Sequence, residues 1–314
     1  MSARSAEPLR LLSLFSLGAA ALAILIVPAT AHAWGPLAHL SISAQALAEL
    51  PATASPLRGL LGGLANEFLY GSLAADIVVG KNLARWTNHC HNWKNGFRVL
   101  AASRSHAERA FAWGFLAHLA ADTVAHNYYV PWKTVTSFHA VRARHAYWEL
   151  RYDQRMDPAL SRIAREVSHR SHRRHDALLR TELKAGCVLP FSVSRGLFSS
   201  LLASARTPKF QAFSRLALAR DRNLALEDDV VDETSRLAVD AIVDLLCHGE
   251  AARCVRSDAT GRVPIHTANL LRRGLASERE RRDAHLVAAE TRDAFRRAVH
   301  GPLVLPGRAA KLAA

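Results

Sequence analysis

Apolar residues recur three and four positions apart along most of this 314-residue chain, and no run of alternating residues stands out. This spacing places apolar side chains on one face of an α-helix, whereas a half-buried strand needs a period of two. The clearest expected helix opens at Ser105, which is placed to form a capping box with Glu108, and ends at Pro131. Other helices are expected over residues 41–50, 56–65, 139–156, 159–183, 192–203, 227–247 and 277–299. The predicted class is therefore all-α.

The first 33 residues have a different pattern. Arg4 and Arg10 precede a nearly continuous apolar run over 11–27, and Ala31-His32-Ala33 is a small-x-small cleavage site. This order is that of a secretory signal peptide. An uncleaved membrane anchor is the alternative, but the run is slightly short for a span. We expect cleavage after Ala33 and a secreted or periplasmic protein.

The mature chain is then expected to be a single multi-helix domain over residues 34–314. Its metal-binding core would span 34–152 and its completing helices 153–301, with a loop-like tail over 302–314. Val263-Pro264 is also expected in a loop. No long apolar run occurs after the first, so no further membrane crossing is expected.

Composition bears on whether the chain is globular and on what it binds. Half of the residues are apolar and 22% are charged, which excludes a disordered chain. The formal charge of +14 suits anionic partners, either a membrane surface contacted peripherally or nucleic acid. An Arg-rich solvated surface explains the same number. The basic segment 162–175 has the same two interpretations. No obligate protein partner is evident.

The chain has four cysteines, Cys90, Cys187, Cys247 and Cys254, and none is in a Cys-x-x-Cys motif. A thiolate zinc site is therefore not expected. Four cysteines allow three pairings, which the sequence leaves open. In an exported protein Cys247–Cys254 is the easiest bridge to imagine.

Side chains that bind metals gather in the first half of the mature chain. His118 and Asp122 are four residues apart, so both lie on one face of their helix, and His126 extends the row. His145 and Glu149 repeat this spacing on another helix. Imidazole nitrogen and carboxylate oxygen are the zinc ligands outside cysteine sites. Each pair alone is an ordinary helix pair, but charged groups on apolar helices are costly to bury, and a metal offsets that cost.

The motifs as a set resemble those of zinc-dependent phospholipase C. They are Trp34-Gly35…His39, Ala75-Asp76, His89-Cys90-His91-Asn92-Trp93, His118-x-x-x-Asp122…His126 and His145-x-x-x-Glu149. The fungal single-strand-specific zinc nucleases share this architecture. The resemblance covers residues 34–152 and implies an all-helical domain with up to three zinc ions.

The resemblance also implies the ligands. The first zinc would lie at Trp34, His39 and Asp122, the second at Asp76, His89, His118 and Asp122, and the third at His126, His145 and Glu149. Trp34 would bind through its free α-amine and its carbonyl oxygen, and Asp122 would bridge two ions. His89 fits the family spacing better than His91. Asp76 is the carboxylate implied as a general base as well as a ligand.

The implied reaction is hydrolysis of a phosphodiester. A phospholipid substrate would yield diacylglycerol and a phosphorylated head group. A zinc nuclease on the same scaffold and a non-catalytic zinc-binding exported protein are the alternatives. Tyr128, Tyr129 and Trp132 would serve either lipid, as an apolar rim, or nucleic acid, by base stacking.

Overall fold

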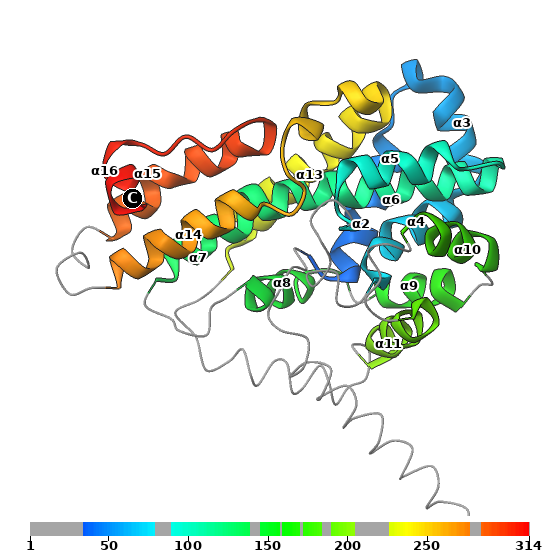
Figure 1. Cartoon of the computed structure of the whole chain (residues 1–314), viewed down its shortest axis with the longest axis horizontal. Coiled ribbons are helices and arrows are strands. Elements are labelled where there is room, and N and C mark those ends of the chain that lie inside the picture. Colours follow the sequence, from blue (N-terminus) through cyan, green and yellow to red (C-terminus); the bar gives the residue numbers. More distant parts are fainter. Residues whose placement is uncertain are drawn as a thin grey trace, which may run out of the picture.

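The computed structural model describes residues 34–78, 89–138, 145–157, 159–169, 172–183, 190–204, 226–276 and 284–313. The regular elements within these ranges are all helices, which confirms the all-α prediction (Figure 1). None of the helices in them is both long enough and apolar enough to span a membrane. The expected signal peptide and Cys187 lie outside the described residues.

The α-helices are α2 (Pro36–Glu49), α3 (Ser55–Gly63), α4 (Ala65–Ala74), α5 (Trp93–Ala101), α6 (His106–Val124), α7 (Val130–Thr136), α8 (His145–Asp153), α9 (Leu160–His169), α10 (Arg173–Glu182), α11 (Phe191–Ser204), α13 (Asp228–His248), α14 (Arg262–Leu275), α15 (Ala284–Arg297) and α16 (Gly307–Ala313). Shorter 3₁₀ turns are η1 (Ala52–Ala54), η2 (Ala75–Ile77), η7 (Gly249–Ala251), η8 (Arg253–Arg256) and η10 (Ala298–His300), and η5 (Ala125–Tyr129) is a π-helical turn.

Helix α6 is the central element, and α2, α4, α5 and α13 all pack against it (Figure 1). Its start has the predicted capping box between Ser105 and Glu108. The prediction that Pro131 ends this helix was wrong, because α6 continues through η5 into α7. The Val130 N–H bonds to the Ala125 carbonyl, five residues back, so the hydrogen-bond ladder is already rearranged where Pro131 lacks its donor.

Two glycines allow α4 to cross α6 at very short range. A Cβ on Gly71 would lie 2.0 Å from the Phe111 carbonyl oxygen, and one on Gly114 would lie 1.9 Å from that of Phe68. Any side chain at either position would separate the helices. The close crossing brings Ser72 and, just beyond α4, Asp76 onto the face of α6 that carries His118.

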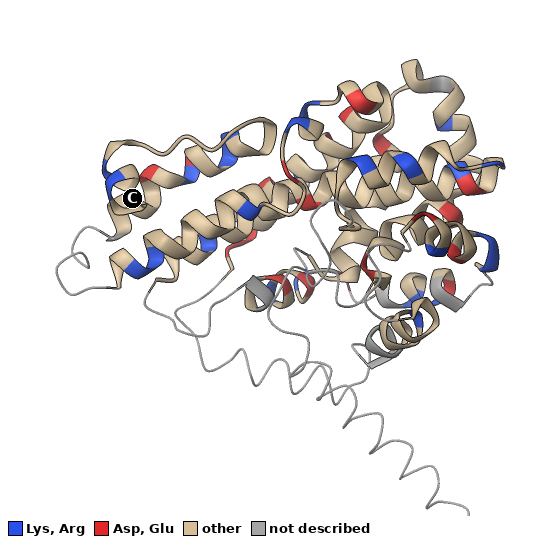
Figure 2. Ribbon diagram, viewed as in Figure 1, with Lys and Arg blue, Asp and Glu red and all other residues tan. Residues whose placement is uncertain are grey.

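The C-terminal helices complete the shell. Helices α14 and α15 pack against η5 and α7, and α16 packs against both. The prediction of a loop at Val263-Pro264 was wrong, because a proline in the first turn of α14 needs no backbone donor. The expected tail likewise contains α16. Lys and Arg are spread over several helices, among them α5, α10 and α14 (Figure 2).

The expected Cys247–Cys254 bridge is not formed. Both cysteines are free thiols, as is Cys90. Cys254 is buried with its Sγ 3.8 Å from the Ala241 carbonyl oxygen, whereas Cys247 is exposed on α13. The two side chains therefore face different environments despite their short separation in sequence.

Candidate metal centre

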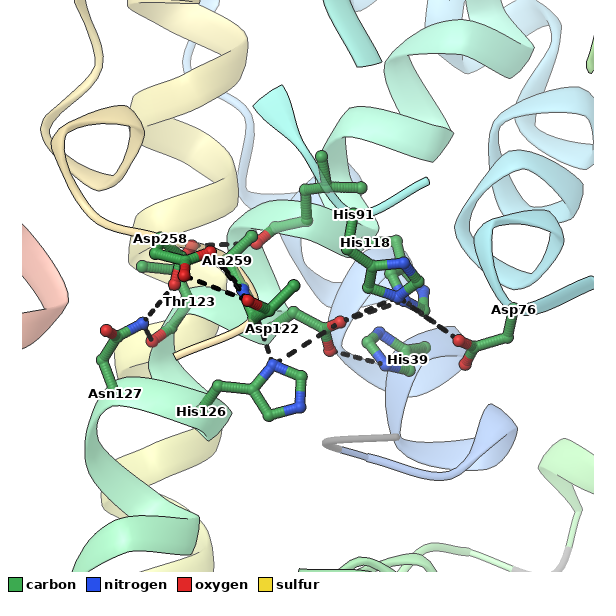
Figure 3. A network of polar contacts seen from close by, with 12 residues as sticks. His39, Asp76, His91, His118, Asp122, Thr123, His126, Asn127, Asp258 and Ala259 are labelled. Atoms are coloured by element: carbon green, nitrogen blue, oxygen red, sulfur yellow. Dashed lines mark hydrogen bonds and ion pairs between the residues drawn. The ribbon is translucent and has the colours of Figure 1, made fainter. Parts of the chain in front are cut away.

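Four side chains from three chain segments place their donor atoms close together, with two imidazoles between two carboxylates (Figure 3). His118 and Asp122 lie on one face of α6, Asp76 lies in η2, and His91 lies just before α5. The His91 Nε2 atom is 3.3 Å from Asp76 Oδ1, 3.1 Å from Asp122 Oδ2 and 3.0 Å from His118 Nε2. The His118 Nε2 atom is 3.8 Å from Asp76 Oδ1 and 3.3 Å from Asp122 Oδ2.

The separations that involve the two imidazole nitrogens, 3.0–3.8 Å, are close to those between neighbouring ligands of a tetrahedral zinc ion. Zinc bonds of about 2.0–2.2 Å place neighbouring donor atoms about 3.3–3.6 Å apart. Both oxygens of Asp122 are buried and accept no hydrogen bond from the described residues, although imidazole nitrogens lie close to them. The donors lie close together, and the Nε2 atoms of His91 and His118 are within hydrogen-bonding distance of each other at 3.0 Å. A buried carboxylate in this state needs a cation to offset its desolvation.

Backbone carbonyls fix the tautomers of two histidines. The Nδ1 atom of His118 lies 2.8 Å from the Ser72 carbonyl oxygen, and that of His126 lies 2.6 Å from the Ala259 carbonyl oxygen. A carbonyl can only accept, so Nδ1 carries the proton in both rings. In the neutral form of each ring, Nε2 then carries the lone pair, which is the arrangement of histidine ligands in many zinc sites.

The protonation states also suit metal binding. Burial, followed by the neighbouring His39, lowers the pKa of His118 to about 4, so its imidazole is neutral at neutral pH. Burial raises the pKa of Asp122, but His118 and His126 outweigh it and hold that pKa well below its ordinary value. A neutral imidazole and an ionised carboxylate are the forms that bind zinc.

His91, and not His89, lies among these four donors. The two residues are close in sequence, but the Nδ1 atom of His89 accepts the backbone N–H of His91 at 3.1 Å. The Nδ1 atom of His91 lies 3.1 Å from Cys90 Sγ, which leaves its Nε2 directed at Asp76 and Asp122. The family spacing favoured His89 for this position, but spacing does not reveal which side of a turn a side chain faces.

The second oxygen of Asp122 faces another donor. His39 Nε2 on α2 is 3.3 Å from Asp122 Oδ1, and the His39 ring stacks on that of His118 with centroids 3.8 Å apart. Trp34 is fully buried, with its ring centroid 6.2 Å from that of His39. Asp122 Oδ1 thus faces His39, whereas Oδ2 faces His91 and His118. His39 also has a ligand atom within 4.8 Å of those of Asp76 and His118.

The remaining candidate ligands are placed less completely. His126 lies on the π turn, with its Nδ1 atom 3.9 Å from Asp122 Oδ2. Glu149 is buried on α8, which packs against α2 and α7. His145 begins α8, but its side chain lies outside what the structure describes. A third group of donors at this end of the centre stays a prediction.

A loop from the C-terminal half contacts the His126 ring (Figure 3). The sequence motifs did not predict this contact. The Ala259 carbonyl accepts from the His126 ring, and the Asp258 carbonyl accepts from Asn127 Nδ2 at 2.9 Å. Gly261 has φ of +54°, and a Cβ there would lie 2.2 Å from the His126 carbonyl oxygen. Asp-x-Thr-Gly at 258–261 is a recognisable turn signal, but it carries no information about the distant helix that the turn contacts.

Comparison with known families gives one match. Residues 38–190 match the family model described as zinc dependent phospholipase C. This segment belongs to the zinc-dependent phospholipase C family. Neither the curated proteins nor the solved structures give a match.

The phospholipase C segment holds every candidate ligand except Trp34, which lies four residues before it. It ends just before α11 begins at Phe191. The loop that orients His126 lies beyond this zinc-dependent phospholipase C segment. The metal centre of this chain therefore draws on residues that the family model does not cover.

Proposed function

We propose that the protein is a zinc-dependent phosphodiester hydrolase of the phospholipase C type, which converts a phospholipid to diacylglycerol and a phosphorylated head group. The observation that carries this proposal is the cluster of Asp76, His91, His118 and Asp122 at zinc-like spacing within a zinc-dependent phospholipase C segment. Bound zinc supplies positive charge that clamps phosphate oxygens and acidifies a water molecule.

The ligand assignment follows the resemblance with one change. Asp76, His91, His118 and Asp122 would hold one ion, with His91 in place of His89. Trp34 and His39 would hold a second ion together with Asp122. His126, His145 and Glu149 would hold the third. The Trp34 ligand needs a free α-amine, so this assignment includes cleavage after Ala33 and export from the cytoplasm.

Asp76 is the proposed general base. Its side chain is 13% exposed, compared with 1% for His91 and for Asp122. A group that takes a proton from an attacking water must reach that water. Among the four donors, Asp76 thus lies at the accessible edge, where a phosphate and a water would approach.

A nuclease on the same scaffold is the second candidate, and the charge of +14 favours it. The aromatic residues expected to stack on bases do not support it. Tyr128 and Tyr129 are fully buried, so the expectation that they contact substrate was wrong. Trp132 packs against two cations, with the Arg292 guanidinium 4.5 Å and the Lys133 ammonium 5.4 Å from its ring centroid. The burial of Tyr128 and Tyr129 counts equally against an apolar rim for lipid and against stacking on bases. Phospholipid is the preferred substrate because residues 38–190 match the phospholipase C family model, and peripheral contact with an anionic membrane stays a prediction.

The test uses the mature chain starting at Trp34. Its zinc is counted, and it is assayed against phosphatidylcholine, phosphatidylinositol and single-stranded DNA. Release of diacylglycerol that depends on zinc supports the proposal, and cleavage of DNA alone supports the nuclease. A zinc-loaded protein that cleaves no phosphodiester would be the non-catalytic zinc-binding protein.

A further inference from the structure

The start of α2 is capped by a residue from far along the chain. Gly35 precedes the helix and has no side chain to bond the first backbone N–H groups. The Oδ1 atom of Asp153, the last residue of α8, accepts the Ala38 N–H at 2.8 Å. A carboxylate at this position satisfies an open donor and faces the positive end of the helix dipole. Asp153 therefore fixes the place where the mature chain enters the fold.

Gly35 and Asp153 are in close contact. A Cβ on Gly35 would lie 2.4 Å from the carboxyl carbon of Asp153. No residue with a side chain fits here unless the carboxylate moves. The first turn of α2 is thus seated directly on the end of α8.

The neighbouring Tyr152 packs against Trp34. Its ring lies 5.0 Å from the Trp34 ring, centroid to centroid. Its hydroxyl is 2.6 Å from Ser235 Oγ and 3.1 Å from Thr234 Oγ1 on α13. The last two residues of α8 therefore form one seat for Trp34 and Gly35, and α13 anchors that seat.

The seat is coupled to the metal centre through one helical turn. The His39 N–H donates to the Gly35 carbonyl at 3.2 Å, and the His39 Nε2 atom lies 3.3 Å from Asp122 Oδ1. A shift of Gly35 would therefore move Trp34 and His39 together, away from Asp122. Metal ligands need placement to within about half an ångström.

From these contacts we infer that Asp153 is a positioning residue for the metal site at the mature amino terminus. Its carboxylate seats Gly35 so that the Trp34 α-amine and the His39 imidazole reach one zinc ion. The inference rests on the proposed function, because it assumes the free amine at Trp34. No zinc ligand role is assigned to Asp153 itself.

The test is a double-mutant cycle on zinc affinity. Asp153→Ala is made in the mature chain and in a chain with one extra alanine before Trp34, which lacks the free amine at the right place. Zinc affinity and zinc count are measured by competition with a chelator. We expect about 10- to 100-fold weaker binding of one ion in the mature chain, as for other residues that orient metal ligands. In the extended chain, which has already lost that ion, Asp153→Ala should change the affinity of the remaining ions less than twofold.

Controls separate seating from folding. Asp153→Asn keeps an acceptor oxygen for Ala38 and should recover part of the affinity, and it carries the test if Asp153→Ala does not fold. Asp240→Ala, an exposed aspartate on α13, should leave the zinc count and affinity unchanged. Melting of the metal-free proteins shows how far each variant remains folded.

Each outcome has one meaning. An equal loss of affinity in both chains, or no loss in either, overturns the seating role of Asp153. A mature reference protein that binds zinc only at the Asp76 and Asp122 donors also overturns it, while the proposed function stands. A mature protein that binds no zinc at all refutes both.

Discussion

Exchange of His91 or His89 for alanine gives the sharpest test of the metal centre. The Nε2 atom of His91 lies 3.0–3.3 Å from three other donor atoms, whereas the Nδ1 atom of His89 accepts the His91 backbone N–H at 3.1 Å. Both side chains are buried and they are two residues apart. The two variants therefore remove the same chemical group from almost the same place.

The expected loss of zinc affinity differs between the two variants because each loses a different interaction. A zinc site with four ligands binds with about 10–16 kcal/mol, so one ligand contributes about 2.5–4 kcal/mol, or about 10²- to 10³-fold in affinity. Loss of one buried hydrogen bond costs about 0.5–1.5 kcal/mol, or about 2- to 12-fold. His91→Ala should thus weaken zinc binding at least about fivefold more than His89→Ala does.

The assay is competition between each variant and a chromophoric chelator at neutral pH, with the zinc count measured after equilibration. Circular dichroism of the metal-free proteins is the control that tests whether both variants are folded. A larger loss for His89→Ala than for His91→Ala would refute the placement of His91 and restore the family spacing as the better guide.

Three further outcomes follow from the packing. Gly114→Ala places a Cβ 1.9 Å from the Phe68 carbonyl oxygen and should lower the free energy of unfolding, measured in urea, by about 1–3 kcal/mol or more. Gly62→Ala has open space around its Cβ and should not lower the free energy of unfolding. Gly261→Ala forces a side chain toward His126 at a positive φ, so it should weaken zinc binding in a chelator assay, and unchanged affinity would argue against the orienting loop. Burial raises the pKa of Tyr152 to about 12, so its stabilisation is present below its ordinary pKa of 10.0 and is lost as the pH rises towards 12. Between pH 10 and pH 12, the free energy of unfolding of Tyr152→Phe, measured by chemical unfolding, should fall by about 2 kcal/mol less than that of the parent protein. An equal fall in both proteins would contradict the raised pKa of Tyr152.

The sequence predicts the helices better than it predicts their interruptions. Helical spacing and the Ser105–Glu108 capping box are local signals, and both are found in the structure. Pro131 was misinterpreted because a proline ends an isolated helix, whereas here a π turn accommodates it. The Cys247–Cys254 expectation failed for a similar reason, since spacing alone does not reveal which face of α13 is buried.

The candidate site shows the same difference between positions that local spacing determines and positions that it does not. Residues on one helix, such as His118 and Asp122, have relative positions that the helical repeat determines, and the structure brings them together. His91 lies in a turn, where backbone geometry and not residue type decides which histidine faces Asp76. Asp153 and Ala259 act through contacts over more than a hundred residues of sequence, and a single sequence contains no local signal for such pairs.

The π turn at η5 inserts one residue beyond the α-helical count in the middle of the longest continuous helical run described, from His106 to Thr136. Because each residue of an α-helix turns the chain by about 100°, removal of that residue would rotate α7 by about 100° relative to α6. Helices α14 and α15 pack on η5 and α7, so their angular position around the central axis depends on this single insertion. The rotation of the helix at η5 thus links the direction in which His126 faces to the position of α14 and α15.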